Sequence, residues 1–253
     1  MKRKVSKIGQ STLMVSLPHK WVKEYNIEKG DEVDLDIEGM VIKIQKSGIT
    51  RRQKKNSTLT MDYENEKIFR WHLNNLYRTG FDKITVKFTK QKSLDHIKTI
   101  TEQLLLGFEV VNEESDGVNN SCTIENLTEP TADRCDTLLR KIFFIVHESY
   151  NILIEGLKKN TYNDIKKLFH LKTQCDRFTN FFSRTRYKTR DLQPFSWTLV
   201  FQLLQTQHSI YYCYKQLSET ETKTNKEIIE YIKDAHKIFY AVEKYHYKKD
   251  FKN

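Results

Sequence analysis

The fold of the N-terminal region is decided by residues 7–37, which read KIGQSTLMVSLPHKWVKEYNIEKGDEVDLDI. Apolar and polar residues alternate over 13–17 and again over 33–37, which is typical of strands with one apolar face. Between these runs, Pro18 suits the first turn of a helix, because the N–H that it lacks is not needed there. That helix has an apolar stripe formed by Trp21, Val22 and Tyr25. Asn26 can adopt the left-handed conformation that ends a helix.

Two further apolar runs flank this stretch, Val5 to Ile8 before it and Met40 to Ile44 after it. The pattern therefore predicts four short strands and one short helix within residues 1–46. Such a unit has too little core to be stable alone, and it presents open strand edges. Pairing with a second copy would close those edges, so we expect a dimer.

The motifs in this region form a recognisable set. They are K-x-G-x-S, a strand that ends in L-P, a W-V helix and I-x-x-G-D-x-V, and they extend from Lys7 to Ile44. Together they resemble the swapped-hairpin β-barrel of AbrB/MazE/SpoVT-type DNA-binding domains. The resemblance implies an obligate homodimer with interleaved strands, in which the basic first strand and the turn after it hold double-stranded DNA.

Charge supports a polyanionic partner for this region. The chain is formally +10, and residues 1–23 carry six basic side chains and no acid, whereas residues 24–38 carry seven acids against Lys29. Such a localised basic stretch is typical of a nucleic-acid footprint. The candidate DNA-binding residues are Arg3, Lys4, Lys7, Gln10, Ser11 and Lys20.

These candidates differ in what they offer to DNA. The basic side chains suit phosphates, and Gln10 and Ser11 suit base edges. By the resemblance, Lys7 and Gln10 match basic and amide positions of the first hairpin, and Ser11 lies in the same turn. Arg3 and Lys4 are expected to extend the first strand. The sequence departs from many relatives in having no Arg at 13–17.

The rest of the chain falls into three segments that differ in composition and in the spacing of their apolar residues. Residues 47–58 are basic and polar and predict a linker; residues 59–128 predict a small α/β unit; residues 129–253 predict a helical bundle. The fold class is thus multidomain α+β. In the α/β unit we expect helices at 64–77 and 93–106 and strands at 84–88, 108–111 and 122–127. In the bundle we expect helices at about 131–158, 162–187, 195–218 and 224–249.

Residues 59–253 resemble archaeal proteins that join such a barrel to a PhoU-like helical domain. The resemblance depends on the order of parts, on Y-x-x-G-F-D-x-I-x-V at 77–86, on Gly107–Val110 and on Cys175–Phe178. It implies a role in regulating phosphate uptake. PhoU-type bundles bind metal clusters through repeated carboxylates, but here residues 172–174 read KTQ and residues 205–209 read QTQHS. Asp176 alone cannot hold an ion, so we predict no metal cluster and no cofactor.

Other functional classes find little support. The four cysteines form no CxxC pair, no apolar run reaches the ~20 residues that span a bilayer, and no signal-peptide core follows the basic start. We therefore expect a cytoplasmic protein without membrane insertion. The eight histidines form no close ligand set, and neither GxxxxGK[ST], GxGxxG nor GxSxG occurs. The sequence thus favours a non-enzyme.

Two functional hypotheses remain. The first is a DNA-binding transcriptional regulator that binds as a homodimer or higher oligomer, with the helical domain contacting an effector or protein partner. The alternative is a PhoU-like adaptor that contacts a phosphate transporter or kinase, with the barrel serving only to dimerise. The basic first strand favours the first hypothesis, and the missing Arg at 13–17 favours the second.

Overall fold

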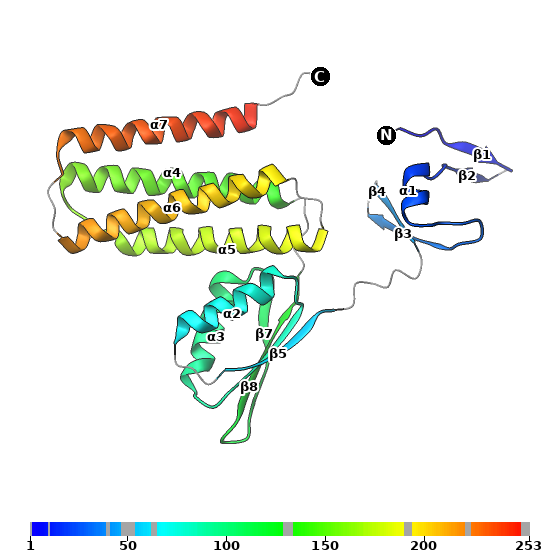
Figure 1. Ribbon diagram of the computed structural model, residues 1–253, viewed down its shortest axis with the longest axis horizontal. Helices are drawn as coiled ribbons and strands as arrows, with labels where there is room; N and C mark the ends of the chain where they lie inside the picture. The colour runs from blue at the N-terminus through cyan, green and yellow to red at the C-terminus, as the bar shows by residue number, and fades with distance from the viewer. Residues whose placement is uncertain are drawn as a thin grey trace. The chain divides into compact units, whose positions relative to one another are not determined.

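The computed structural model divides the chain into two compact units, Met1–Gln53 and Lys54–Asn253 (Figure 1). The structure describes residues 2–9, 11–38, 41–46, 54–61, 65–128, 134–189, 194–220 and 224–248. Each unit is described by itself below. Both strands and long helices are present, so the mixed α+β class expected from the sequence is confirmed.

The N-terminal unit contains two β-hairpins and one short helix. Its elements are β1 (Ser6–Ile8), β2 (Thr12–Met14), α1 (His19–Glu24), β3 (Val33–Glu38) and β4 (Val41–Lys46). β1 pairs with β2 and β3 pairs with β4, both antiparallel, and the two pairs form separate two-stranded sheets. The strands therefore do not close a barrel within the described part of a single chain. β2 is also shorter than the predicted strand, since it ends at Met14.

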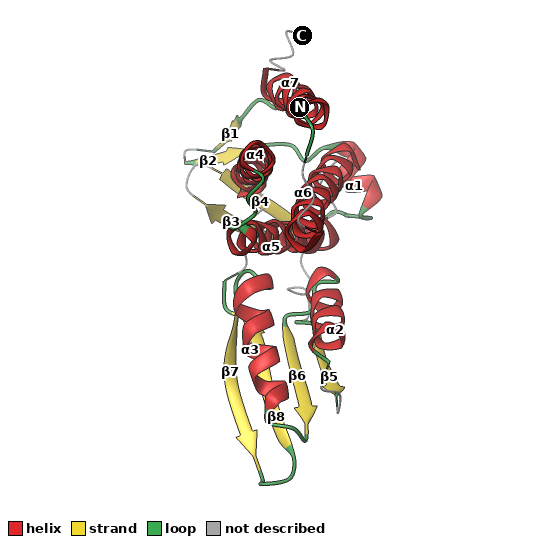
Figure 2. Cartoon of the chain, turned by 90° about the vertical axis from the view of Figure 1, so that its left-hand side faces the viewer, coloured by secondary structure: helices red, strands yellow, loops and turns green. Residues whose placement is uncertain are grey.

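The second unit begins with a four-stranded sheet. Its elements are β5 (Asn56–Thr60), α2 (Glu66–Arg78), β6 (Lys83–Phe88), α3 (Lys92–Leu104), β7 (Phe108–Ser115) and β8 (Asn120–Asn126). The strand order is β5-β6-β8-β7; β5 is parallel to β6 and the other neighbours are antiparallel. Helices α2 and α3 cover one face of the sheet (Figure 2). Alternate residues of β6, from Ile84 to Phe88, are buried beneath them.

The linker predicted at residues 47–58 is wrong at its C-terminal end, because Asn56–Thr60 forms strand β5 at the edge of the sheet. Residues 47–53 of that predicted linker lie outside the described residues. Strand β5 has no run of apolar residues that would predict a core strand, since Leu59 is its one large apolar residue. Main-chain pairing with β6, which the composition of the segment does not reveal, makes it a strand.

The remainder of the second unit consists of four long helices, α4 (Cys135–Lys159), α5 (Ile165–Thr189), α6 (Pro194–Thr220) and α7 (Lys226–Lys248). The helices predicted from apolar spacing are all present, with ends shifted by a few residues. α4, α5 and α6 share a continuous apolar core, and α7 lies along α4 at the edge of the bundle (Figure 1). Phe239 is the buried residue of α7 among the described residues.

Helix α5 joins the bundle to the α/β part through a buried guanidinium. Arg184 is fully buried, and it donates to the carbonyls of Tyr77 and Phe81 at 3.1 and 2.6 Å. It also forms an ion pair with Asp82 at 2.7 Å. The ring faces of Tyr77 and Phe108 lie about 5 Å from the guanidinium carbon. Since the two parts share this contact, they form one compact unit with two apolar cores.

Two motif glycines have backbone reasons to be glycine. Gly80 has φ +78° directly before the Phe81-Asp82 contact with Arg184. Gly107 has φ +85°, and a Cβ there would lie 2.2 Å from the carbonyl oxygen of Thr128. The segments around 77–86 and 107–110, which carry the PhoU-like resemblance, thus have structural roles at this junction.

The buried ion pair predicts a large effect on stability. Replacing Arg184 by Met removes one of the two ion-pair partners of Asp82, leaving Lys188, and it takes the Arg184 donor away from the carbonyls of Tyr77 and Phe81, so we expect a loss of about 1–3 kcal/mol in the free energy of unfolding. Chemical denaturation followed by far-UV circular dichroism measures this. The control is Lys166→Met on the exposed side of the same helix, which we expect to change stability by less than about 0.5 kcal/mol. Equal stability of the two variants would contradict the assignment.

Candidate nucleic-acid interface

The first hairpin carries the basic residues that the sequence singled out. Lys7 lies in the middle of β1, directly across from Leu13 of β2, and is exposed. Opposite residues of an antiparallel pair lie on the same face, so Lys7 and Leu13 share one face of the hairpin. Ser11 lies in the connecting turn and is exposed. Gln10, the candidate amide for reading bases, lies outside the described residues.

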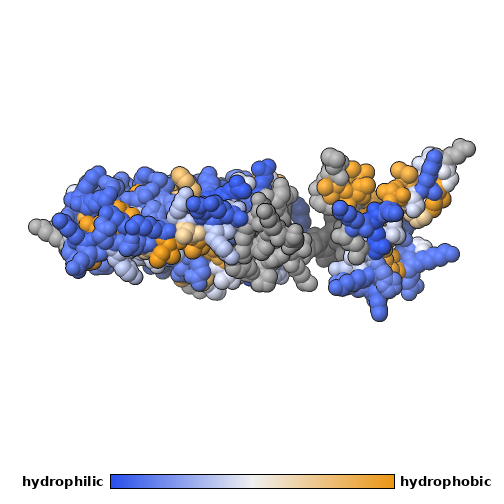
Figure 3. Space-filling model, turned by 90° about the horizontal axis from the view of Figure 1, so that it is seen from above, coloured by the Kyte–Doolittle hydropathy of each residue, from blue (hydrophilic) through white to orange (hydrophobic). Residues whose placement is uncertain are grey.

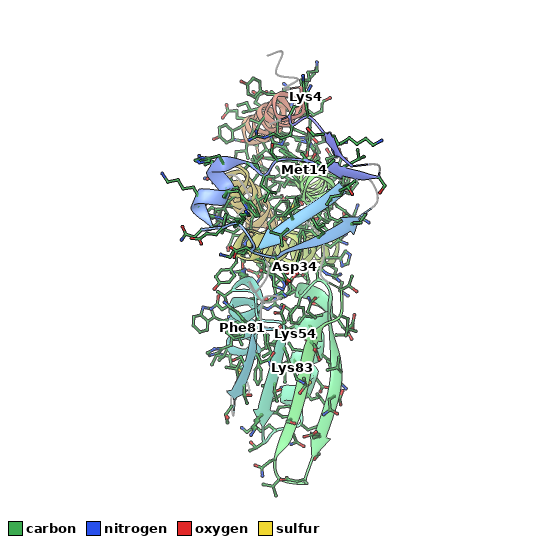
Figure 4. The ribbon with its side chains drawn as sticks, turned by 90° about the vertical axis from the view of Figure 1, so that its right-hand side faces the viewer. Lys4, Met14, Asp34, Lys54, Phe81 and Lys83 are labelled. Atoms are coloured by element: carbon green, nitrogen blue, oxygen red, sulfur yellow. The ribbon has the colours of Figure 1, made fainter. Side chains whose placement is uncertain are left out.

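Arg3 and Lys4 are placed differently from the prediction. They were expected to extend the first strand, but β1 begins at Ser6 and both residues precede it. Both are exposed, and Lys4 is labelled near the chain start in Figure 4. Strand pairing stops at Ser6 because its partner, Met14, is the last residue of β2. The two cations therefore form an arm that leads into the hairpin.

Helix α1 presents Lys20 on its exposed surface. The helix ends at Glu24, and Asn26, two residues further on, has φ +47°, so the left-handed residue predicted at this helix end is confirmed. The ammonium of Lys46 on β4 donates to the carbonyls of Tyr25 and Asn26 at 3.3 and 2.9 Å. A cation at these last carbonyls stabilises a helix end. Sequence analysis gave Lys46 no role, because it is twenty residues away from the helix that it caps.

Lys46 also forms an ion pair with Asp31. Its ammonium lies 3.5 Å from the carboxylate of Asp31, which in turn accepts a hydrogen bond from the backbone N–H of Glu28 at 3.0 Å. That backbone hydrogen bond, with the Lys46 charge adding to it, lowers the pKa of Asp31. Of the basic groups, Lys46 is thus engaged with the acidic stretch, whereas Arg3, Lys4, Lys7 and Lys20 lie on the surface.

The N-terminal unit has no core of its own. Among its described residues no side chain is buried. Its large apolar side chains are mostly exposed, with fractions such as 69% for Leu13 and 72% for Ile37. Each face of the first hairpin carries an exposed apolar side chain, because Ile8 and Met14 lie on the face opposite to Leu13. Figure 3 shows hydrophobic surface gathered on this unit.

The residues expected near a PhoU-type metal site do come together in the helical bundle. Asp176 on α5 receives a hydrogen bond from His208 on α6 at 2.8 Å and one from Lys172 at 2.8 Å, one on each carboxylate oxygen. Burial alone raises the pKa of Asp176, but the partnership with His208 and Lys172 outweighs it and lowers the pKa overall. Asp176 is therefore an ion-paired acid.

This arrangement does not fit a metal cluster. The Lys172 ammonium lies on one oxygen of Asp176, where a metal-binding bundle would need a second carboxylate. No group of three or more His, Cys, Asp or Glu residues in the described chain is placed to hold a metal ion. Within that same part, no helix has the length and apolar content that crossing a membrane requires.

A second polar cluster links α4 to α7, and sequence analysis missed it. His147 lies 2.7 Å from the carboxylate of Glu243 through Nε2 and 2.8 Å from Nε2 of His236 through Nδ1. Because an ionised Glu243 can only accept, Nε2–H of His147 donates to it, and in the neutral ring Nδ1 then accepts from His236. His236 also stacks on Tyr150. These residues are 89 and 96 positions apart, so no local motif reveals them.

Comparison with known proteins agrees with the N-terminal geometry. Residues 7–52 match the protein family described as antidote-toxin recognition MazE, bacterial antitoxin. The chain therefore carries a domain of the AbrB/MazE type at its N-terminus. No curated protein and no solved structure matches the chain. A domain of this type fits a DNA-binding regulator or an antitoxin-like role.

The histidine pair predicts a pH-dependent attachment of α7. Burial lowers the pKa of His236, and the neighbouring His147 lowers it further. As the pH falls below 6.5, the ordinary pKa of histidine, His236 becomes protonated when α7 is detached from the bundle but stays neutral when α7 is docked. Protonation therefore favours the detached state, and docking weakens. We expect faster amide hydrogen exchange across α7 at about pH 5.5 than at about pH 8, after correction for the intrinsic rate.

A substitution separates this effect from general acid sensitivity. His236→Phe keeps a ring against Tyr150 and removes the titrating group, so it should flatten the pH dependence. His170→Phe, at an exposed position of α5, is the matched control and should leave the dependence unchanged. The interpretation fails if His236→Phe retains the full pH dependence.

A further prediction concerns metal. Since both oxygens of Asp176 are engaged, we expect the purified protein to show no stoichiometric tight binding of iron, zinc or manganese. Dialysis against each metal followed by elemental analysis measures this. Stoichiometric retention that Asp176→Asn abolishes would overturn the prediction.

Proposed function

We propose that this protein is a transcriptional regulator that binds double-stranded DNA as a homodimer through its N-terminal unit. The observation that carries the proposal is the exposed basic arm and strand on a domain of the AbrB/MazE type. Arg3, Lys4 and Lys7 supply phosphate contacts, and Lys20 adds one from α1. Ser11, in the turn of the first hairpin, and Gln10, which precedes it in the sequence, are the candidates to read base edges.

The exposure of the described side chains of the N-terminal unit, none of which is buried, supports the homodimer. An exposed apolar side chain costs free energy that burial would recover, at about 25 cal/mol per Å² of apolar area. The exposed apolar side chains of the first hairpin need cover, which a single short helix does not provide. A second copy offers the same apolar faces and strand edges, so two copies complete each other.

We propose that the process regulated by this protein is phosphate uptake. Support comes from the PhoU-like order of parts in residues 59–253 and from the motif segments at the Arg184 junction. In this proposal the helical region senses an effector or contacts a partner. The proposal includes no enzymatic activity.

A second candidate function is favoured by a specific surface. Helix α7 exposes an apolar stripe whose members are three, seven, four and three residues apart: Ile228, Tyr231, Ile238, Val242 and Tyr245. A contiguous exposed stripe of this kind is typical of a protein-binding surface. It supports an adaptor that contacts a transporter or kinase through its helical region, with the N-terminal unit serving to dimerise.

Charge reversal tests the DNA-binding proposal. We expect Lys4→Glu with Lys7→Glu to weaken DNA binding by about tenfold or more and to reduce the steepness of the fall of log affinity with log salt by about 3 to 4, because a homodimer loses four phosphate contacts at about 0.9 each. Fluorescence anisotropy with the protein's own upstream DNA and with a random duplex, over a salt series, measures both. Native mass should still be that of a dimer, because the proposed interface is built from apolar side chains and strand edges and uses neither lysine.

The matched control changes the same net charge elsewhere. Lys226→Glu with Lys244→Glu reverses two exposed charges on α7 and should leave DNA binding within about twofold. Unchanged binding by the Lys4/Lys7 variant would show that the surface is wrongly assigned. Weak and equal binding of both duplexes by the parent protein, lost near physiological salt, would favour the adaptor.

A further inference from the structure

The two edges of the four-stranded sheet are built differently (Figure 2). The β7 edge carries the exposed acids Glu109, Glu113 and Glu114 and is interrupted by a bulge between Val110 and Asn112. Charges and bulges are the usual devices that prevent an edge strand from pairing with another chain. The β5 edge, Asn-Ser-Thr-Leu-Thr at 56–60, contains no charge and its pairing with β6 shows no bulge.

The direction of the free backbone groups on β5 follows from its pairing with β6. The carbonyl of Lys55 accepts from Asp82 and Lys83, and the N–H of Met61 donates to Lys87, so odd-numbered residues face β6. Because the direction alternates along a strand, the N–H and C=O of Asn56, Thr58 and Thr60 point away from the sheet. No described strand of the chain pairs with that edge.

We propose that β5 pairs antiparallel with β5 of a second copy of this chain, joining the two sheets across a twofold axis at Thr58. Pairing of two identical edges about a twofold axis is antiparallel. In this register Thr58 faces Thr58 of the partner subunit, and Asn56 faces the partner subunit's Thr60. Each pair exchanges two hydrogen bonds, so about six bonds form along the edge.

The side chains suit this register. The facing pairs on the open side of the sheet are uncharged and small, so no like charges meet across the axis. On the side covered by α2, Leu59 is half-buried, whereas its neighbour Val86 on β6 is fully buried. An added strand would cover Leu59 further. Lys54, Phe81 and Lys83 mark the start of β5 and β6 in Figure 4.

The short length of chain between β4 and β5 favours a second copy of this chain as the partner that pairs with the open edge of β5. Nine residues separate β4, which ends at Lys46, from β5, which begins at Asn56. They span at most about 35 Å. Two N-terminal units in one dimer would hold two β5 strands at an effective concentration on the order of millimolar. This step rests on the dimer proposed above.

Cysteine cross-linking in the full chain tests the register. In a Cys213→Ser background, which removes the exposed cysteine, we expect Thr58→Cys to form a disulfide-linked dimer under mild oxidation. Asn56→Cys should link at least tenfold more slowly, since it would lie about 13 Å from its own copy in this register. Val118→Cys, 71% exposed in the β7–β8 turn, is the control for random collisions.

The outcomes separate this inference from the proposed function. Rapid linking at residue 58 and slow linking at residues 56 and 118 supports the β5 pairing. A dimeric native mass without rapid linking at residue 58 overturns the pairing and leaves the N-terminal dimer standing. A monomeric native mass with no linking overturns both.

A proline pair gives a second readout that does not depend on cysteine geometry. Thr58→Pro removes an N–H that points away from β6, so the fold should persist while the edge loses its central pair. Ser57→Pro removes an N–H that faces β6 and should destabilise the sheet itself. We expect exchange of the β5 amides to accelerate in Thr58→Pro without loss of the thermal transition. Unchanged β5 exchange in that variant would contradict the pairing.

Discussion

A two-stranded hairpin cannot bury its own apolar side chains, and this constraint governs the N-terminal unit. Both of its hairpins expose large apolar residues, and none of its described side chains is buried. The contacts that organise it locally are polar, above all the Lys46 ammonium on the last carbonyls of α1. Those contacts set the shape of the unit, but its hydrophobic stabilisation has to come from another surface. The proposed homodimer follows from that need.

The second unit differs from the first because it contains two apolar cores that have to be joined. Arg184, which is buried between them, joins them by donating to the carbonyls of Tyr77 and Phe81 and to the carboxylate of Asp82. Asn180, one turn earlier on α5, accepts from Arg78 and donates to the carbonyl of Leu104. These buried polar contacts are directional, so they fix α5 against the sheet layer more specifically than apolar packing alone. The helical region is therefore held in one orientation relative to the α/β part of the same unit.

Sequence reasoning succeeded where the signal was periodic and local. The long helices and the strand β6 followed from apolar spacing, and the helix end at Asn26 followed from the conformational preference of one residue. It failed at β5, because a polar edge strand is defined by the partner beside it. It also failed at Arg3 and Lys4, which precede the first strand instead of extending it. In both places the range of strand pairing, a non-local property, decided the outcome.

By itself, the sequence determined the type of the N-terminal domain, the position of its basic residues and the helical character of the C-terminal half. These depend on spacing and composition, which the chain carries locally. The tertiary structure alone decided which distant groups meet: Arg184 with Asp82, Asp176 with His208, and His147 with His236 and Glu243. It also decided which strand lies open at the edge of the sheet. Such pairings join residues that are far apart along the chain, and they exist because folding brings their helices and strands into contact.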